Sequence, residues 1–441
     1  MVITTAIVSM QLVALPFSKY LENIFWLIVE KGFSLAVGVV VGIYVARYLQ
    51  PEQYGLLNYA ISFVGIFAVF STLGLDQIMV RELSRDQSKR FDLLGTGLVL
   101  KAAGSLFLLF LMGVILIFFK HSAFTNTLII IIAVAELFRA FEVINYFYQS
   151  RVQSKYVVYT QVFINTLVSL IKIGLVLVHA PLIWFAIMVA VGSLFNAAGF
   201  IYTYHTKSGS LWNWNFKKEL AFSLLRESWP LTLYGLALYI QARIDQVMLG
   251  TMLNNYEVGQ YSVALKFIEI FGFVPMVLMS TFTPAISQAK LASEDLYHQR
   301  LLNLYRLMFA MFLVVAIPIY FFSEDVITLL YGIDYQPAGY LLSLFALRLF
   351  FSNMGVGKSV FIVNESLFRY SLLTVVVGAA TNILFNFWLI PLYGPTGSIL
   401  ASMISFTVSI FLIDFFFAKP FQNQKLMWKG ILTFWKLKEA Q

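Results

Sequence analysis

Residues 24 to 55 read IFWLIVEKGFSLAVGVVVGIYVARYLQPEQYG. The run from Ile24 to Tyr48 is long and apolar enough to cross a bilayer as one helix. Glu30 and Lys31 nevertheless sit inside it, and ionisable groups at membrane depth need water or a partner. A polar turn follows, and a second apolar run begins directly after Gly55. The stretch predicts two spanning helices joined by a tight turn, with charges that face a hydrated interior.

The composition is that of a polytopic membrane protein. Of 441 residues, 60% are hydrophobic and 12% are charged, against roughly 25% charged in soluble domains. Cysteine is absent and the four histidines lie far apart, so we expect neither a metal site nor a cofactor. The net charge of +8 is explained by basic cytoplasmic loops, and we expect no nucleic-acid partner. Residues 1 to 18 lack the features of a signal peptide, so we expect an interfacial segment or a start codon assigned too early.

Twelve apolar runs divide the chain. All are expected to be helices, because unpaired backbone cannot face lipid. The predicted fold is an all-α integral membrane protein with these twelve transmembrane helices: 24–48, 56–79, 93–118, 126–148, 157–178, 181–204, 228–252, 258–284, 304–322, 338–363, 370–391 and 396–418.

Basic residues in the connections indicate the orientation. If the N-terminus is cytoplasmic, the opposite side receives only Arg47 and Lys120. By the positive-inside rule, both termini are then cytoplasmic, and we expect a multi-pass protein of the bacterial cytoplasmic membrane. The cytoplasmic side receives Lys19, Arg81, Arg85, Lys89, Arg90, Arg151, Lys155, Lys207, Lys217, Lys218, Arg226, Lys290, Arg300, Arg306, Arg369, Lys419, Lys425, Lys429, Lys436 and Lys438.

A weak internal repeat supports a division of six spans and six spans. When Gly55 is aligned with Gly259, Ala46 meets Gly250 and Ala60 meets Ala264. Six spans per half give both halves the same orientation, related by a pseudo-two-fold axis along the membrane normal. We therefore expect two six-helix lobes, at residues 1–205 and 228–418. A cytoplasmic connection is expected at residues 206–227 and a basic cytoplasmic tail at residues 419–441.

Charged residues inside the spans define the candidate site. Each central Lys or Arg costs about 2.5 to 3.5 kcal/mol on insertion, so these groups are expected to share water or partners. A surplus of cations in a hydrated cavity suits a phosphate-bearing substrate. The candidate pyrophosphate-binding residues are Lys31, Arg243, Lys266, Arg139, Arg348 and Lys358, and the candidates for charge balance or ion coupling are Glu30, Asp245, Glu269 and Glu136.

Several of these charges admit a local explanation. Lys266 and Glu269 lie one turn apart and can pair with each other. Lys101 and Arg139 lie near helix ends, so they can instead snorkel to the interface. Arg243 and Asp245 point in different directions, so at least one of them is expected to meet another helix or a ligand.

Catalytic motifs are absent from the sequence. Gly357-Lys358-Ser359 resembles the end of a phosphate-binding loop, but Ser352 replaces the first glycine and the segment lies inside an apolar span. No nucleophile elbow or zinc-protease helix is present. The protein is therefore predicted not to be an enzyme, and a gradient or downhill delivery would drive any transport.

A family resemblance appears at residues 23 to 101. Asn23-x-x-Trp26-Leu27-x-x-Glu30-Lys31 is followed by Val45-Ala46-Arg47-Tyr48-Leu49-x-Pro51-Glu52-x-Tyr54-Gly55, then by Leu73-Gly74-Leu75-Asp76 and Arg81-Glu82-Leu83. Together with Arg243-x-Asp245 and Gly259-x-Tyr261-x-x-Ala264, this resembles the Wzx-type polysaccharide flippases of the multidrug/oligosaccharidyl-lipid/polysaccharide exporter superfamily. One departure is Gln50, which stands where a glycine is usual before the proline.

The resemblance implies a substrate and a mechanism. The substrate would be an oligosaccharide on undecaprenyl pyrophosphate, carried from the cytoplasmic to the periplasmic leaflet by alternating access. Candidate partners would be the lipid bilayer, a polysaccharide polymerase and a chain-length regulator. Three alternatives remain: an ion-coupled multidrug exporter, which needs an acidic rather than a basic cavity; a flippase for the peptidoglycan precursor lipid; and a membrane glycosyltransferase or polymerase, which needs larger loops.

Overall fold

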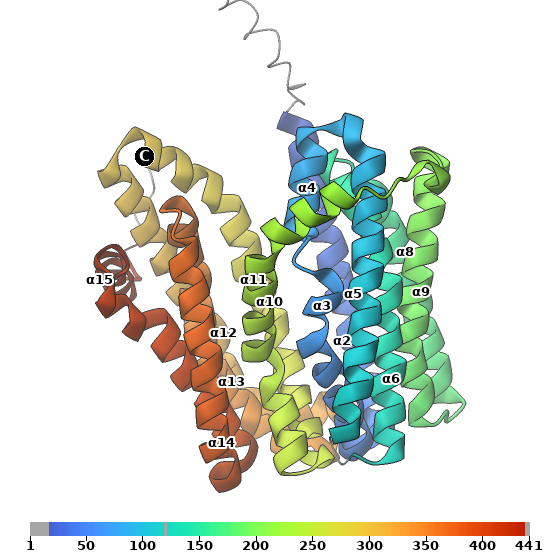
Figure 1. Ribbon diagram of the computed structural model, residues 1–441. Coiled ribbons are helices and arrows are strands. Elements are labelled where there is room, and N and C mark those ends of the chain that lie inside the picture. Colours follow the sequence, from blue (N-terminus) through green and yellow to red (C-terminus); the bar gives the residue numbers. More distant parts are fainter. Residues whose placement is uncertain (1–16, 119–120, 437–441) are drawn as a thin grey trace, which may run out of the picture.

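The computed structural model describes residues 17–118 and 121–436 and is helical almost throughout (Figure 1). The expectation for residues 1 to 18 falls almost entirely outside these ranges. The α-helices are α2 (Phe17–Phe67), α3 (Val69–Thr72), α4 (Asp76–Arg85), α5 (Arg90–Phe118), α6 (Ala123–Phe138), α7 (Val143–Ser150), α8 (Lys155–Leu177), α9 (Leu182–Lys207), α10 (Lys218–Met252), α11 (Asn255–Ala292), α12 (Glu294–Tyr331), α13 (Gln336–Asn364), α14 (Phe368–Thr407) and α15 (Ala418–Leu432).

Short helices of other types join some of these elements. A π-helical turn, η5, directly extends α14. The 3₁₀ turns are η1 (Gln87–Lys89), η2 (Arg139–Glu142), η3 (Leu211–Asn213), η4 (Ile333–Tyr335) and η6 (Ile413–Phe416), and η5 spans Val408–Leu412.

The helices run side by side in two groups. In Figure 1, α5, α6, α8 and α9 stand on one side, α12 to α15 stand on the other, and α10 lies between them. Among the described residues, eight helices are long and apolar enough to cross a membrane, so the chain is a multi-pass membrane protein. The count of twelve spans and the boundaries of two lobes stay predictions.

Two of the long helices consist of two arms each. Gln50 in α2 (φ 59°, ψ 165°) and Gly394 in α14 (φ 58°, ψ −138°) leave helical geometry. Each precedes a proline, Pro51 or Pro395, whose ring disfavours the helical conformation in the residue before it. The arms match the helix pairs that the sequence predicted on either side of these two positions.

Two sequence predictions were wrong in detail. The helix expected over 56–79 is broken, because α2 ends at Phe67 and Leu73 and Gly74 both have positive φ before α4 begins. The span expected over 126–148 is interrupted by η2. In both cases the apolar pattern continues across the interruption. Helix α10 begins at Lys218, inside the expected connection over 206–227, and the bounds of that connection stay a prediction.

The segment expected to be a tail begins with a helix that packs on the bundle. Met427 of α15 is fully buried, and an added Cβ at Gly430 would lie 2.8 Å from Cβ of Tyr305. The Tyr305 hydroxyl donates to Oδ1 of Asn423 (2.8 Å), and Arg306 donates to Thr433 (3.0 Å). The residues from 418 to 433 are thus attached to α12.

Helices α2 and α11 make backbone contact at the turns that the internal repeat equates. An added Cβ at Gly55 would lie 1.7 Å from the carbonyl oxygen of Asn255, and one at Gly259 would lie 2.1 Å from the carbonyl oxygen of Pro51. Pro51 and Asn255 are themselves equivalent in that alignment, since each precedes its glycine by four residues. Such reciprocal contacts are typical of a local two-fold axis. Only glycine leaves enough room for backbone to approach backbone this closely.

Candidate functional site

A cavity of about 380 Å³ lies between helices from both ends of the chain. We call it the cationic cavity, because Lys31 of α2, Arg243 of α10 and Arg348 of α13 line it together with one acid, Glu269 of α11. The formal charge of these four groups is +2. The remaining lining is mostly apolar: Leu35, Ile268, Gly272, Phe273, Met276, Phe345, Leu349 and Ser352.

The cations of this cavity differ in how they are held. Arg243 forms an ion pair with Glu269 (3.2 Å), and about a third of its side chain is exposed. Arg348 lies over the rings of Phe345 (5.0 Å) and Phe406 (5.5 Å). Within the described residues, neither Lys31 nor Arg348 pairs with a carboxylate. Both therefore keep charge and hydrogen-bonding capacity for a ligand.

Lys266 lies beside this cavity rather than in its lining. Its ammonium donates to the Tyr54 hydroxyl (3.0 Å) and sits 4.8 Å from the centre of that ring. It remains within electrostatic range of Arg243 and Glu269. The possible local pair between Lys266 and Glu269 does not form, because Glu269 pairs with Arg243 instead.

Asp245 lies in a separate buried network in the second half of the chain. Its carboxylate accepts hydrogen bonds from Tyr261 (2.6 Å), Asn386 (2.7 Å) and Ser402 (2.6 Å). All of these donors are neutral, and only 1% of Asp245 is exposed. The expectation that Arg243 or Asp245 would meet another helix is confirmed for both residues.

Glu136 and Arg139 belong to a charge cluster in the first half of the chain. Arg139 pairs with Glu136 and Glu142 (both 3.0 Å), and Glu142 also pairs with Lys101 (3.0 Å). The Lys101 ammonium further donates to the Tyr146 hydroxyl (2.8 Å). The suggestion that Lys101 snorkels is wrong, because only 1% of the residue is exposed.

Two further candidates lie apart from the cationic cavity. Lys358 is buried and forms an ion pair with Asp414 (2.6 Å), which also accepts from Tyr370. Glu30 accepts a hydrogen bond from Ser34 (2.9 Å) on its own helix. Lys358 is thus already neutralised by its partner, whereas Glu30 lies on the helix face next to Lys31.

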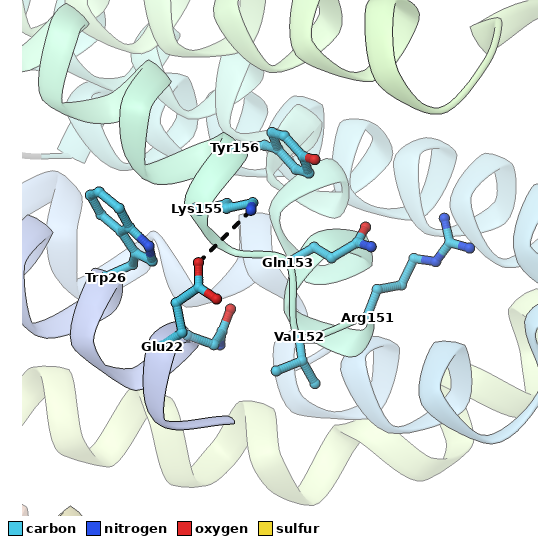
Figure 2. Close-up of a pocket in the computed structure, with 8 residues that line it drawn as sticks. Glu22, Trp26, Arg151, Val152, Gln153, Lys155 and Tyr156 are labelled. Atoms are coloured by element: carbon cyan, nitrogen blue, oxygen red, sulfur yellow. Dashed lines mark ion pairs between the residues drawn. The ribbon is translucent and has the colours of Figure 1, made fainter. Parts of the chain in front are cut away.

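A small recess of about 150 Å³ lies where α2 begins, against the turn between α7 and α8. Figure 2 shows Glu22 and Lys155 facing each other across it, while the Arg151 side chain points away. The backbone N–H of Ser154 donates to Oδ1 of Asn23 (2.7 Å). Asn23, from the family-like motif, thus joins the start of α2 to the start of α8.

Sequence reasoning missed the uncharged partners. The Asp245 network uses Asn382 and Asn386, which lie four residues apart on α14. Gln161 and Asn165 are spaced likewise on α8, and both line another internal pocket, described below. Pairs of amides at i and i+4 in an apolar helix were a readable signal, because such side chains share one face.

Comparison with known proteins identifies the family. Residues 20–290, more than half of the chain, match the family model described as polysaccharide biosynthesis protein. The chain belongs to this family. A Haloferax volcanii protein described as a probable low-salt glycan biosynthesis flippase is 24% identical over 200 residues, which are 43% of this chain. The match spans 41% of that relative's length.

Solved structures support the fold. A multidrug resistance MATE family transporter of the MOP superfamily, in an inward-facing conformation, has a TM-score of 0.68 at 16% identity and covers 91% of this chain and 96% of its own. A lipid II flippase in an inward closed conformation has a TM-score of 0.68 at 15% identity, with coverages of 93% and 97%.

Proposed function

We propose that this protein is a flippase that moves a polyprenyl-pyrophosphate-linked oligosaccharide across the membrane by alternating access. The observation that carries the proposal is the cationic cavity, where Lys31, Arg243 and Arg348 come from helices in both halves of the chain and outnumber the single acid. Membership of the polysaccharide biosynthesis family supports the class of substrate. Undecaprenyl pyrophosphate is the carrier that the sequence resemblance implies.

The chemistry of the cavity suits a pyrophosphate. A guanidinium binds phosphate oxygens in a bidentate manner, and an ammonium binds them as a point charge. In this proposal Arg348 and Lys31 bind the pyrophosphate directly, while Glu269 holds Arg243 in place until the substrate arrives. Lys266 adds positive potential from the second layer. The apolar walls would accommodate the first part of the prenyl chain.

Asp245 is the acid we assign to ion coupling. Its network offers several oxygen and hydroxyl groups around one carboxylate, and no Lys or Arg of the described residues forms an ion pair with it. A proton or a metal cation bound there would neutralise a buried charge, which is otherwise expensive. Glu30 and Glu136 are assigned to charge balance, because Glu30 accepts a hydrogen bond from Ser34 and Glu136 forms an ion pair with Arg139.

The orientation follows from the basic residues. The start of α2, the turn before α8 and the start of α10 lie at one end of the bundle (Figure 1). We assign this end to the cytoplasm, in a bacterial cytoplasmic membrane, because its connections carry most of the Lys and Arg residues. The substrate would then load from the cytoplasmic leaflet. A polysaccharide polymerase and a chain-length regulator are the proposed downstream partners.

The proposal is tested by removing the charges of the cavity one at a time. Lys31→Gln, Arg243→Gln and Arg348→Gln are each introduced into a strain whose surface polysaccharide depends on this protein, and polysaccharide is measured at matched expression. Each loses a charge-assisted contact of about 1.5 to 3 kcal/mol, so we expect about a 10- to 100-fold loss of transport. Lys89→Gln serves as the control, because Lys89 is exposed and does not line the cavity.

Two outcomes would contradict the proposal. Full transport in all three variants would separate the cavity from substrate binding. Export of cationic drugs by the purified, reconstituted protein, with no dependence on a prenyl pyrophosphate, would instead favour the multidrug exporter.

A further inference from the structure

A second internal pocket, of about 170 Å³, lies within the first half of the chain. We call it the amide chamber. Its lining comes from α6, η2, α7, α8 and α9, and it contains no residue of the cationic cavity. The polar lining residues are Asn145, Gln161, Asn165, Ser193 and Asn196, together with Arg139 and Glu142, and the apolar ones are Phe138, Ala197 and Phe200.

The chamber has unused hydrogen-bonding capacity. Nδ2 of Asn196 donates to the carbonyl of Gly192 (3.0 Å), but its buried Oδ1 has no partner in the described part of the chain. Gln161 and Ser193 make no side-chain hydrogen bond to any described residue. An unpaired buried polar atom such as Oδ1 of Asn196 costs about 1 to 3 kcal/mol, which favours a polar ligand or water in the chamber. Its volume corresponds to roughly five or six water molecules.

Charge excludes an ion as the natural occupant. Arg139 and Glu142 neutralise each other, and Glu142 also pairs with Lys101. The chamber therefore has no surplus of either sign. Arg139 uses Nε for Glu142 and Nη1 for Glu136, which leaves Nη2 available as a donor. The other free groups are neutral amides and a hydroxyl, which can both donate and accept.

The shape of the lining matches a sugar ring. A pyranose has hydroxyl groups around its edge and C–H groups on its faces. The amides, Ser193 and Arg139 would bind the edge, and the rings of Phe138 and Phe200 would contact a face. A drug-sized apolar ligand does not fit this description, because such sites are typically larger and mostly hydrophobic.

The chamber and the cationic cavity flank the same helix. Asn165 donates to Oγ of Ser34 (2.9 Å), and Ser34 donates to Glu30 (2.9 Å), so this face of α2 adjoins the chamber. Lys31 and Leu35 are each the next residue along α2 and line the cationic cavity. Successive residues on a helix are about 100° apart, so α2 presents one face to each site.

We infer that the amide chamber binds one sugar ring of the glycan and thereby selects among lipid-linked oligosaccharides. The inference rests on the proposed function, since it assigns the glycan to a site of its own beside the one for the pyrophosphate. Asn196 and Gln161 are the residues that would determine specificity, because Oδ1 of Asn196 is buried without a partner and the Gln161 amide makes no side-chain hydrogen bond to a described residue.

The test uses two probes on the purified full-length protein. The first is a panel of methyl glycosides of glucose, galactose, mannose and N-acetylglucosamine, with binding followed by thermal unfolding and by hydrogen exchange of α8 and α9. The second is farnesyl pyrophosphate, a soluble prenyl pyrophosphate that reports on the cationic cavity. The variants are Asn196→Leu and Gln161→Leu. The control is Asn364→Leu, because Asn364 likewise donates to the carbonyl four residues before it (2.8 Å).

We expect at least one glycoside to protect the wild type and the control, and to bind about tenfold more weakly to Asn196→Leu and Gln161→Leu. Both variants should bind farnesyl pyrophosphate normally, whereas Arg348→Gln should lose that probe and keep the glycoside. Equal stabilisation of all proteins by every glycoside would overturn the inference, because excluded sugars stabilise proteins nonspecifically. Glycoside binding without any binding of farnesyl pyrophosphate would instead count against the proposed function alone.

Discussion

Two acids, one in each half of the molecule, are enclosed in different ways. In the first half, Glu142 lies between two fixed cations, Lys101 and Arg139. In the second half, Asp245 is more deeply buried, yet its three hydrogen bonds come from neutral side chains. A carboxylate between fixed cations mainly holds helices together. A carboxylate among neutral donors can take up and release a cation, and this difference separates a structural acid from one suited to coupling.

The equivalent turns of the two halves also differ. In the first half, the turn between the two arms of α2 is made by Gln50 with a φ of 59°. The equivalent residue in the second half, Asn254, has a φ of −159° and caps α11, because its side chain accepts a hydrogen bond from the N–H of Glu257 (3.0 Å). The first arrangement strains the backbone, and the second relieves an unpaired helix end.

The largest effect is expected at Glu142. Glu142→Gln leaves Lys101 and Arg139 without their shared carboxylate, so we expect unfolding in detergent to become easier by about 3 kcal/mol. Denaturant titration of the purified protein measures this change. Glu22→Gln is the control, since its 3.8 Å pair with Lys155 is exposed and contributes less than about 0.5 kcal/mol. Equal losses of unfolding free energy in the two variants would show that the cluster has no special structural role.

At Asp245 the expected effect on function exceeds the effect on stability. Asp245→Asn keeps the shape of the side chain and some of its hydrogen bonds, so we expect a loss of only about 1 kcal/mol. Transport should fall at least about tenfold, because about 1.4 kcal/mol of lost coupling already corresponds to that factor. Ser402→Ala, which keeps the carboxylate, should retain transport. Normal transport in Asp245→Asn, measured by surface polysaccharide, would erase the contrast between the two acids.

Substitution by glycine should change the stability of the protein in opposite directions at the two turns. Gln50→Gly removes backbone strain of about 1 to 3 kcal/mol at an entropic cost of about 0.5 to 1 kcal/mol, so we expect a net gain near 1 kcal/mol. Asn254→Gly should lower the free energy of unfolding by only a few tenths of a kcal/mol, because the side-chain hydrogen bond of the helix cap is lost. Thermal unfolding of both variants decides the matter, and a loss of stability in Gln50→Gly would show that the turn is not strained.

The smallest effect concerns Glu365, between α13 and α14. Burial tends to raise the pKa of this carboxyl, but hydrogen bonds from Lys290 and Lys419 outweigh burial and lower the pKa. A lowered pKa stabilises the fold at any pH above the unfolded-state pKa of about 4.3. This contribution is lost as the pH falls through the folded-state pKa.

Glu365→Gln should therefore cost less than about 1 kcal/mol at neutral pH, because the Lys419 partner is largely exposed. The difference from the wild type should vanish on acidification below the ordinary range of a glutamate. Stability curves recorded from neutral to acidic pH measure it, and a difference that persisted at low pH would point to lost packing rather than lost charge.

Much of the fold could be predicted because apolar runs and prolines act locally. The turns at Pro51 and Pro395 were placed correctly, since a proline restricts the residue before it whatever the tertiary contacts. The break after Phe67 was missed, because Leu73 and Leu75 continue the apolar pattern while the backbone turns at Leu73 and Gly74. Hydropathy does not register a change in φ.

The candidate site could be predicted only in part. The charges in the spans predicted that cations would share a cavity, and Lys31, Arg243 and Arg348 do so. The sequence did not indicate that Lys358 would find Asp414, because those residues lie 56 positions apart on different helices. Pairing across helices depends on their rotation about their own axes, which a single sequence does not specify.

The glycine contact between residues 55 and 259 has a mechanical consequence. Backbone atoms have no rotamers, so a contact made from backbone alone cannot loosen by side-chain rearrangement. If the halves of the molecule rock against each other, this is the place best suited to serve as a fulcrum, fixed while the helices on either side swing. The displacement of the helices at the cationic cavity would then be set by the distance of the cavity from Gly55 and Gly259.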